Sequence, residues 1–381
     1  MKINEHSLPV IGAILGDIVG SRFELNGTRI KTVEFDFFNI DSHFTDDTVL
    51  TLAIAKWLLE PNNNLIDIVL SLGRQYIDVG FGHSFKNWLR SPAPQPYNSY
   101  GNGSAMRVSA IGSTASTISE VMSLAKDSAI ITHNHEEGIK GAQAVATAIF
   151  LAYNSFPKVC IKEYIEEKFD YNLNRSISDI RNNYDFDSSC QGSVPEAIIA
   201  FLESTDVEDS IRLAVSIGGD ADTQASIAGA ISAAYYKYIP NNYIDMAFAK
   251  LPEDLLSILE MFNDNIPSIS TSSYYVLTAK RTISIRSNIR YTFALAVTDT
   301  TEIIIPKGTK LMIKWHKGNC SECNLLSNKQ SVFEMIEKRL EEKYGENERP
   351  LCNGIQIQVT QSDLLNFSIR EAEMDDMLDL L

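Results

Sequence analysis

Apolar residues recur at helical spacing along most of residues 1 to about 265. In residues 46–60, DDTVLTLAIAKWLLE, they predict a helix that stops before Pro61. The same pattern predicts further helices in residues 118–132, 136–156, 193–204, 207–219 and 223–239. Two of these segments mix glycine with alanine, and such small faces let helix axes approach closely. The pattern therefore predicts a compact, all-α core.

The pattern changes after about residue 270, where β-branched and alternating runs are typical of strands. Strands are predicted at residues 282–286, 291–297, 301–306, 309–315 and 354–360. One helix is predicted between them, at residues 331–345. We therefore expect two domains, a helical domain at residues 1–268 and a small α+β accessory domain at residues 269–381.

Composition adds limits to this picture. The 381 residues are 44% apolar and 22% charged, as in ordinary globular proteins, and the net charge is −16. Such an acidic chain is not expected to bind nucleic acid by bulk electrostatics. Five cysteines imply no disulfide framework, so we expect a cytoplasmic protein. Asp17 interrupts the apolar run at residues 8–21, and no stretch is long enough to predict a membrane span.

Basic residues outnumber acids in the first half of the accessory domain. Between residues 280 and 317 the acids are Asp299 and Glu302, against Lys280, Arg281, Arg286, Arg290, Lys307, Lys310, Lys314 and Lys317. A solvated sheet face explains this pattern. The second interpretation is a docking patch for an acidic protein partner.

The same domain contains the sequence HKGNCSEC. His316, Cys320 and Cys323 have a spacing usable for zinc, with Cys352 as a fourth ligand. A single CxxC is weak evidence, and free thiols in a hairpin are the alternative. The sequence leaves both interpretations open.

Two helix starts carry paired acids. Thr45 precedes Asp46 and Asp47, and the residues Asp220, Asp222 and Thr223 follow a glycine pair. Helix capping is the simpler interpretation, and Thr45 is a suitable N-cap residue. If the two starts faced each other, four carboxylates and two hydroxyls would suit Mg²⁺, Mn²⁺ or Ca²⁺. Two divalent ions would balance the four charges.

Three other segments offer polar groups. Glu24 lies two residues after Arg22, and an isolated acid of this kind is usually a surface residue. The turn at Gly101, Asn102 and Gly103 can bring backbone close to a ligand such as a diphosphate. His133 and His135 are two residues apart, a poor spacing for a zinc pair on a helix, so we expect at most a ligand contact.

Six segments together resemble the ADP-ribosylglycohydrolases, a group that includes the dinitrogenase reductase-activating glycohydrolases. They follow in order over about residues 8 to 265, at 12–24, 44–55, 97–109, 132–144, 189–204 and 216–231. The resemblance implies an all-α ADP-ribosylglycohydrolase-like helical core with a binuclear Mg²⁺ centre, for which Mn²⁺ is a substitute. Capping and turn statistics would not produce the whole series.

The resemblance also implies roles for individual residues. The residues that match the metal ligands are Thr45, Asp46, Asp47, Asp220, Asp222 and Thr223. Those that match the ADP-ribose loop are Gly101, Asn102, Gly103, Ser104 and Met106, with His133 in a ligand-adjacent motif. Glu24 matches the mobile acid near the scissile bond, and catalysis is expected to depend on Glu24, Asp47 and Asp222.

The implied activity is Mg²⁺-dependent hydrolysis of the bond between ADP-ribose and an acceptor on a protein substrate. Family analogy favours arginine as the acceptor. One alternative is a non-catalytic ADP-ribose-binding protein. Another is an immunity or regulatory protein that blocks an ADP-ribosyltransferase by docking. The sequence does not identify the target, the oligomeric state or the role of residues 269–381.

Overall fold

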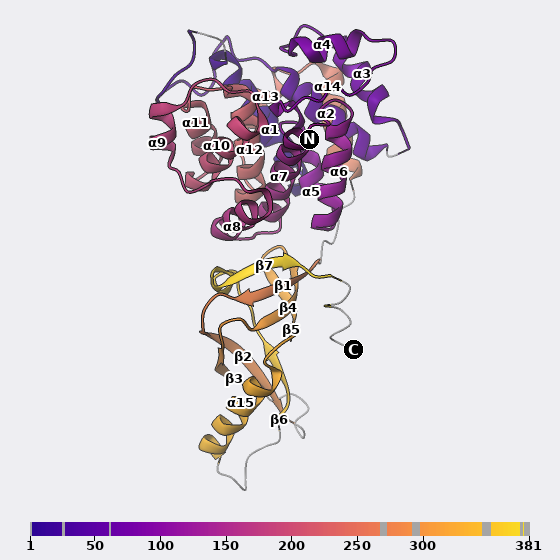
Figure 1. Cartoon of the computed structure of the whole chain (residues 1–381). Coiled ribbons are helices and arrows are strands. Elements are labelled where there is room, and N and C mark those ends of the chain that lie inside the picture. The colour runs from indigo at the N-terminus through magenta and orange to yellow at the C-terminus, as the bar shows by residue number, and fades with distance from the viewer. Residues whose placement is uncertain are drawn as a thin grey trace. The chain divides into compact units, whose positions relative to one another are not determined.

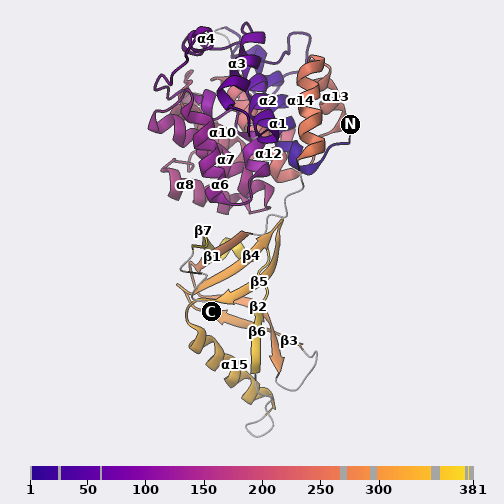
Figure 2. The same cartoon turned by 90° about the vertical axis from the view of Figure 1, so that its right-hand side faces the viewer.

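The computed structural model describes residues 2–24, 27–60, 62–266, 273–291, 298–344, 352–373 and 376. The chain divides into two compact units (Figure 1). The first comprises Met1–Tyr153 and Ile165–Ile269, and the second comprises Asn154–Tyr164 and Ser270–Leu381. The first is helical and the second is built mainly of strands, which confirms the predicted fold class (Figure 2).

Helices make up the first unit. They are α1 (Leu8–Gly20), α2 (Asp46–Leu59), α3 (Leu65–Gln75), α4 (His83–Arg90), α5 (Ser109–Thr114), α6 (Ile118–Ile130), α7 (Glu136–Tyr153), α9 (Ile177–Asn183), α10 (Cys190–Glu203), α11 (Val207–Val215), α12 (Ala221–Tyr236), α13 (Asn241–Phe248) and α14 (Glu253–Asn265). Short 3₁₀ turns are η1 (Glu5–Ser7), η2 (Ser21–Phe23) and η3 (Asn102–Ser104). Helix α8 (Lys158–Phe169) has residues in both units. All six predicted helices are present.

Local capping sets where these helices begin and end. Thr45 caps α2, and its hydroxyl accepts from the Asp47 backbone N–H at 3.3 Å, as predicted. Helix α10 begins at Cys190, before the predicted residue 193, because the Ser189 hydroxyl accepts from the Gly192 N–H at 3.1 Å. Helix α12 ends at Tyr236, where Lys237 adopts a left-handed backbone with φ of 55°.

Helix α1 is buried along its whole length and packs against α12. The contact is between backbones, because a Cβ atom on Gly16 would lie 2.0 Å from the Ala225 carbonyl oxygen. A Cβ atom on Gly20 would lie 2.4 Å from the Ala221 carbonyl oxygen. Small residues therefore bring the end of α1 against the start of α12, which confirms the predicted close approach of helices.

Two antiparallel sheets and a helix form most of the second unit. The strands are β1 (Ser273–Ala279), β2 (Ile283–Tyr291), β3 (Thr298–Ile305), β4 (Lys310–His316), β5 (Asn319–Leu325), β6 (Cys352–Ile357) and β7 (Phe367–Glu371). One sheet has the order β5-β4-β1-β7 and the other β3-β2-β6, and α15 (Lys329–Tyr344) and η4 (Asp363–Asn366) complete the unit. The first sheet packs on the 154–164 segment, where the indole N–H of Trp315 donates to the Asn154 carbonyl at 3.0 Å.

Most predicted elements of this unit are present. Strands β2, β3, β4 and β6 and helix α15 confirm predictions, whereas β1, β5 and β7 were not predicted. Beyond Tyr291, the strand predicted at residues 291–297 lies outside the described residues. None of the described helices combines the length and apolar content of a membrane span.

Several basic side chains of this unit have partners within it. Lys280 pairs with Glu163 at 2.8 Å, and Arg281 donates to the Asn366 side chain at 2.8 Å. Lys314 lies 3.8 Å from Glu322. The docking patch stays a prediction, and the side chain of Arg290 lies outside the described part.

The candidate zinc ligands do not gather on one face of the sheet. His316 follows Trp315 in β4, and neighbouring residues of a strand point to opposite faces. Cys320 lies opposite Trp315, and Cys323 lies opposite Ile313, so both share the face of Trp315. His316 therefore lies on the other face, and the side chain of Cys352 is not among those described. The thiols of Cys320 and Cys323 are free and belong to the hairpin of β4 and β5.

The α1–α12 contact generates a stability prediction. We expect Gly16→Ala to lower the free energy of unfolding by about 2 kcal/mol, because the added methyl must push the two backbones apart. Gly82→Ala is the control, since its Cβ would meet nothing within 4 Å. Loss of an N-cap glycine there should cost no more than about 1 kcal/mol. Denaturant unfolding followed by circular dichroism measures both, and equal effects would contradict the prediction.

Candidate functional site

A cavity of about 570 Å³ opens in the first unit where the segment after η2, the starts of α2 and α12, and η3 meet. Its lining includes the predicted residues Glu24, Asp46, Asp47, Gly101, Asn102, Gly103, Met106, His133, Asp220, Asp222 and Thr223. Thr45 and Ser104 are buried behind the lining. The structure thus gathers side chains that are separated by up to about 200 positions in the sequence.

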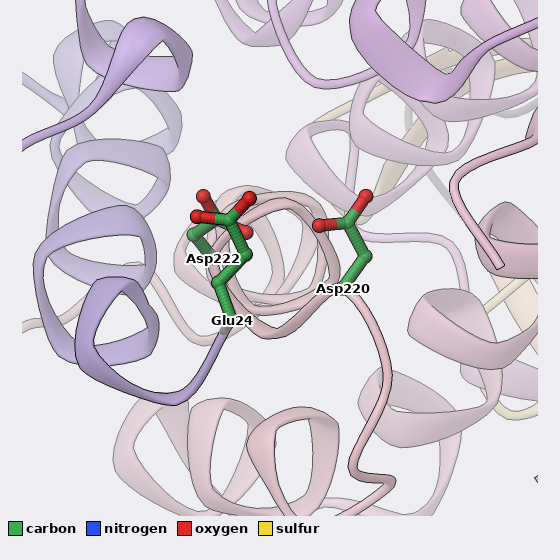
Figure 3. Close-up of side chains that lie close together, drawn as sticks. All are labelled: Glu24, Asp220 and Asp222. Carbon is green, nitrogen blue, oxygen red and sulfur yellow. The ribbon is translucent and has the colours of Figure 1, made fainter. Parts of the chain in front are cut away.

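Three acids form the tightest group in the cavity. Glu24 follows η2, and Asp220 and Asp222 come from the start of α12. One carboxylate oxygen from each lies within 4.8 Å of the others. Figure 3 shows Glu24 reaching from the segment after α1 toward the two aspartates. Asp220 occupies the N-cap position of α12, but its side chain makes no capping bond, so capping does not account for it.

The starts of α2 and α12 meet at this group. The hydroxyl of Thr223 donates to Oδ2 of Asp47 at 3.2 Å. The other oxygen of Asp47, Oδ1, is buried and has no hydrogen-bond donor among the described residues. The side chain of Asp46 lies against Gly80, where a Cβ atom would be 2.8 Å from its Oδ1. Asp46 and Asp47 thus both line the cavity, and the buried Oδ1 of Asp47 has no donor among the described residues.

Removal from water makes ionisation of these acids unfavourable. Desolvation, with the charges of Asp220 and Asp17, raises the pKa of Glu24 to about 7. Desolvation also raises the pKa of Asp46 to about 8, with the charges of Asp17 and Glu24 acting in the same direction. The pKa values of Asp47 and Asp222 lie well above their ordinary range for the same reason. Burial therefore favours protonation of these acids, or their neutralisation by a positive charge.

Asp17 is a site residue that the sequence analysis missed. Its carboxylate is fully buried in α1 and accepts four bonds from the start of α2. Thr45 donates through its hydroxyl at 2.7 Å and its N–H at 2.9 Å, and Thr48 donates at 2.5 Å and 3.1 Å. The hydroxyl proton of Thr45 is thereby directed at Asp17, which leaves an oxygen lone pair for another contact. The available signal was a lone acid inside an apolar helix.

The loop of residues 101–106 supports the acids as well as the cavity wall. The side-chain amide of Asn102 donates to Oδ2 of Asp220 at 2.7 Å and to Ser193 at 3.1 Å. Its backbone N–H donates to the Ser188 carbonyl at 2.8 Å. Ser104 points away and donates to the Gly138 carbonyl at 2.7 Å. Asn102 therefore orients Asp220, and Ser104 anchors the loop to α7.

His133 forms the wall beside this loop. A Cβ atom on Gly103 would lie 3.3 Å from Nε2 of His133, so a residue without a side chain fits best there. Burial, together with the charge of Arg107, lowers the pKa of His133 well below its ordinary value, so the ring is neutral. Arg107 is itself fully buried and donates to Ser128 and Thr132.

Aromatic side chains complete the cavity, and sequence reasoning did not select them. Tyr97 and Tyr100 precede the loop, Phe186 follows α9, and His83 and Phe85 come from α4. Tyr100 and Phe186 are 52% and 40% exposed. Because they come from three unrelated segments, no periodic pattern marks them. The cavity therefore joins an acidic end to flat, partly exposed rings that suit a ligand with sugar and aromatic parts.

Known proteins share this arrangement of segments. The family model for ADP-ribosylglycohydrolase matches residues 10–267. The ADP-ribosylhydrolase ARH3 of Xenopus tropicalis is 27% identical over 308 residues, which cover 61% of this chain and 88% of that protein. The human ARH3 is 28% identical over 302 residues, covering 59% and 83%.

A solved structure shows a similar fold. It is described as an ADP-ribosylglycohydrolase-related protein complex and has a TM-score of 0.53 with 23% sequence identity. The match covers 70% of this chain and 99% of that chain. The family match extends over most of the helical unit and includes every residue that lines the cavity. The chain therefore belongs to the ADP-ribosylglycohydrolase family, whose members are hydrolases of glycosidic bonds.

Proposed function

We propose that this chain hydrolyses the glycosidic bond between ADP-ribose and an acceptor on a protein, with two Mg²⁺ ions as cofactor. The observation that carries the proposal is the convergence of acids from the segment after α1 and from the starts of α2 and α12 beside an aromatic cavity of about 570 Å³. Family membership supports the reaction class.

The residues of the acidic end fit divalent cations. Carboxylate and hydroxyl oxygens are hard ligands of the kind that Mg²⁺ and Mn²⁺ prefer. Among the described residues, Oδ1 of Asp47 is buried without a donor, and burial together with neighbouring carboxylates raises the pKa values of Asp47 and Asp222. A bound cation would offset both effects. The proposed ligands are Thr45, Asp46, Asp47, Asp220, Asp222 and Thr223. The bond from Thr45 to Asp17 orients one of them, as partners of metal ligands commonly do.

The chemistry follows from the positions of the side chains. Bound divalent ions would supply charge that orients ribose hydroxyls and polarises a water. Glu24 is half-buried at the mouth of the acidic group, and a carboxyl with a pKa of about 7 exchanges protons readily at neutral pH. The bond at the anomeric carbon breaks through an oxocarbenium-like state, and the acceptor leaves with the bonding electron pair. Ionised Glu24 takes a proton from the attacking water, and that proton ends on the departing acceptor. Asn102 holds Asp220 in place during this step.

The other wall of the cavity is the proposed site for the rest of ADP-ribose. The loop at Gly101–Gly103, with Met106 and neutral His133, presents backbone and uncharged side chains. Such a surface approaches a diphosphate without placing a carboxylate against it. Arginine as the acceptor rests on family resemblance alone, so the assay below compares acceptors.

The first prediction concerns two proposed ligands. We expect Asp47→Ala and Asp222→Ala to abolish release of ADP-ribose while retaining the fold, because each removes a cation ligand. Asp127→Ala, an exposed acid on α6, is the control and should keep wild-type activity. The assay measures release from arginine-, serine- and nucleobase-linked ADP-ribose, with Mg²⁺ and with EDTA.

The same assay separates the competing functions. A non-catalytic ADP-ribose-binding protein would release nothing from any acceptor, although it would still bind ADP-ribose. A docking protein would keep inhibiting its transferase in both variants and lose that effect when residues 270–381 are deleted. Near-wild-type turnover in either variant would refute the assignment of these ligands.

The second prediction tests the hydroxyl of Thr45 against that of Thr48. Both donate to Asp17, but only Thr45 is a proposed metal ligand. We expect Thr45→Val to weaken Mg²⁺ binding about tenfold or more, within the range seen when metal-site groups are removed. Thr48→Val removes the same kind of bond and should change Mg²⁺ affinity far less. Calorimetric titration measures both, and an equal loss would mean that Thr45 acts only through Asp17.

The third prediction concerns pH. In EDTA we expect thermal stability to rise as the pH falls from about 8.5 to about 6. The folded protein takes up protons at Glu24 near pH 7 and at Asp46 near pH 8, whereas the unfolded chain takes them up only near pH 4. Saturating Mg²⁺ should flatten this dependence, because it stabilises the charged form.

Asp46→Asn supplies the control for this pH effect. It removes one of the two titrating groups, so the slope of melting temperature against pH in EDTA should become smaller. Differential scanning fluorimetry measures the slope. A slope of the opposite sign in the wild-type protein would contradict the assignment of buried, unpaired acids.

A further inference from the structure

The CxxC motif of residues 320–323 lies in β5 and has no part in the proposed hydrolysis. On a regular strand, residues three apart point to opposite faces. Here Cys320 pairs with Trp315, and Cys323 pairs with Ile313. Since residues 313 and 315 of β4 share a face, the two cysteines share that face as well.

A β-bulge causes this arrangement. Glu322 pairs with Lys314 while Cys320 pairs with Trp315, so Ser321 is the extra residue on β5. The Ser321 hydroxyl donates to the Lys314 carbonyl at 3.4 Å. The cysteines therefore lie opposite positions that are two residues apart, or roughly 6.6 Å along a strand. That spacing falls within the range of about 4.4–6.8 Å between Cα atoms that a disulfide spans.

The two thiols are neighbours on one face and differ in character. Interaction with the Cys323 thiol is the main reason why the pKa of Cys320 is lowered. The same interaction, with burial, raises the pKa of Cys323 well above its ordinary value. As a thiol, Cys320 also donates to the Glu322 carbonyl at 3.1 Å. Cys320 is therefore the better nucleophile and Cys323 the neighbouring thiol that can resolve an adduct.

The remaining described cysteines have a different environment. Cys160 and Cys190 are 4% and 0% exposed, and their thiols donate to backbone carbonyls. Burial raises the pKa of each to about 12. Cys320 and Cys323 are only half-buried, so a small reagent can reach them. Cys320 and Cys323 therefore lie near each other and are accessible to a small reagent, and the Cys320 thiol is the more reactive of the two.

We propose that Cys320 and Cys323 form a redox-active pair that a low-molecular-weight disulfide oxidises reversibly to an intrastrand disulfide. The Cys320 thiolate attacks the reagent, forms a mixed disulfide and releases one thiol, which takes up the proton that Cys320 lost. The Cys323 thiolate then attacks the Cys320 sulfur and expels the second thiol. Two protein thiols are oxidised, and one reagent disulfide is reduced to two thiols. This inference is independent of the proposed hydrolysis.

The test uses the full-length protein with glutathione disulfide as the probe. After incubation, free thiols are blocked with iodoacetamide under denaturing conditions, and the peptides are analysed by mass spectrometry. We expect the peptide with Cys320 and Cys323 to be unmodified and lighter by two hydrogens, with Cys160 and Cys190 alkylated. Dithiothreitol should restore alkylation of the pair. A pair that stays fully reduced would overturn the proposal.

Variants assign the two roles. Cys323→Ser should accumulate a stable glutathione adduct on Cys320, whereas Cys320→Ser should give little adduct on Cys323. Cys352→Ser should form the bridge as the wild type does, and loss of the bridge there would overturn the pairing. Purified protein with one bound zinc that protects both thiols from glutathione disulfide would also overturn it. Circular dichroism of each variant confirms that the unit is folded.

Discussion

The site depends on direct backbone contact between α1 and α12. Glycines on α1 leave no room for side chains, with the Cβ position of Gly20 only 2.4 Å from the Ala221 carbonyl. This contact places the residues after α1 beside the first turn of α12, and so brings Glu24 to Asp220 and Asp222. Larger residues would separate the helices and spread the acids, because packed interiors cannot absorb added volume without movement.

Gathering several carboxylates in a buried site lowers the stability of the folded protein, and hydrogen bonds from surrounding residues offset part of this loss. Asp17 receives four hydrogen bonds from the start of α2, Asp220 receives one from Asn102, and Asp47 receives one from Thr223. The bonds fix the orientation of the carboxylates, but within the described part of the chain Oδ1 of Asp47 has no donor. The buried acids lower stability locally, as is common at functional sites, and their proposed role is to hold cations.

The second unit shows the same principle on a smaller scale. A single extra residue, Ser321, turns Cys320 onto the face of Cys323, where regular alternation would separate them. In both units a local departure from ideal geometry brings reactive groups together. In the first it is a glycine-dependent helix contact, and in the second a bulge. The glycines of α1 recur every four residues, at Gly12, Gly16 and Gly20, whereas the extra residue Ser321 follows no period in the sequence.

The sequence by itself determined the helices of the core, most strands of the second unit and the acid pairs at two helix starts, because periodicity and capping act between near neighbours. Motif resemblance added the candidate site, including Glu24 and His133. Only the tertiary structure decided that Asp17 accepts hydrogen bonds from the start of α2, since its partners Thr45 and Thr48 lie 28 and 31 residues away. It also placed Asn102 on Asp220, Tyr97 and Phe186 in the cavity and His316 on the face opposite Cys320. These relations depend on which elements pack together, and no local pattern encodes that choice.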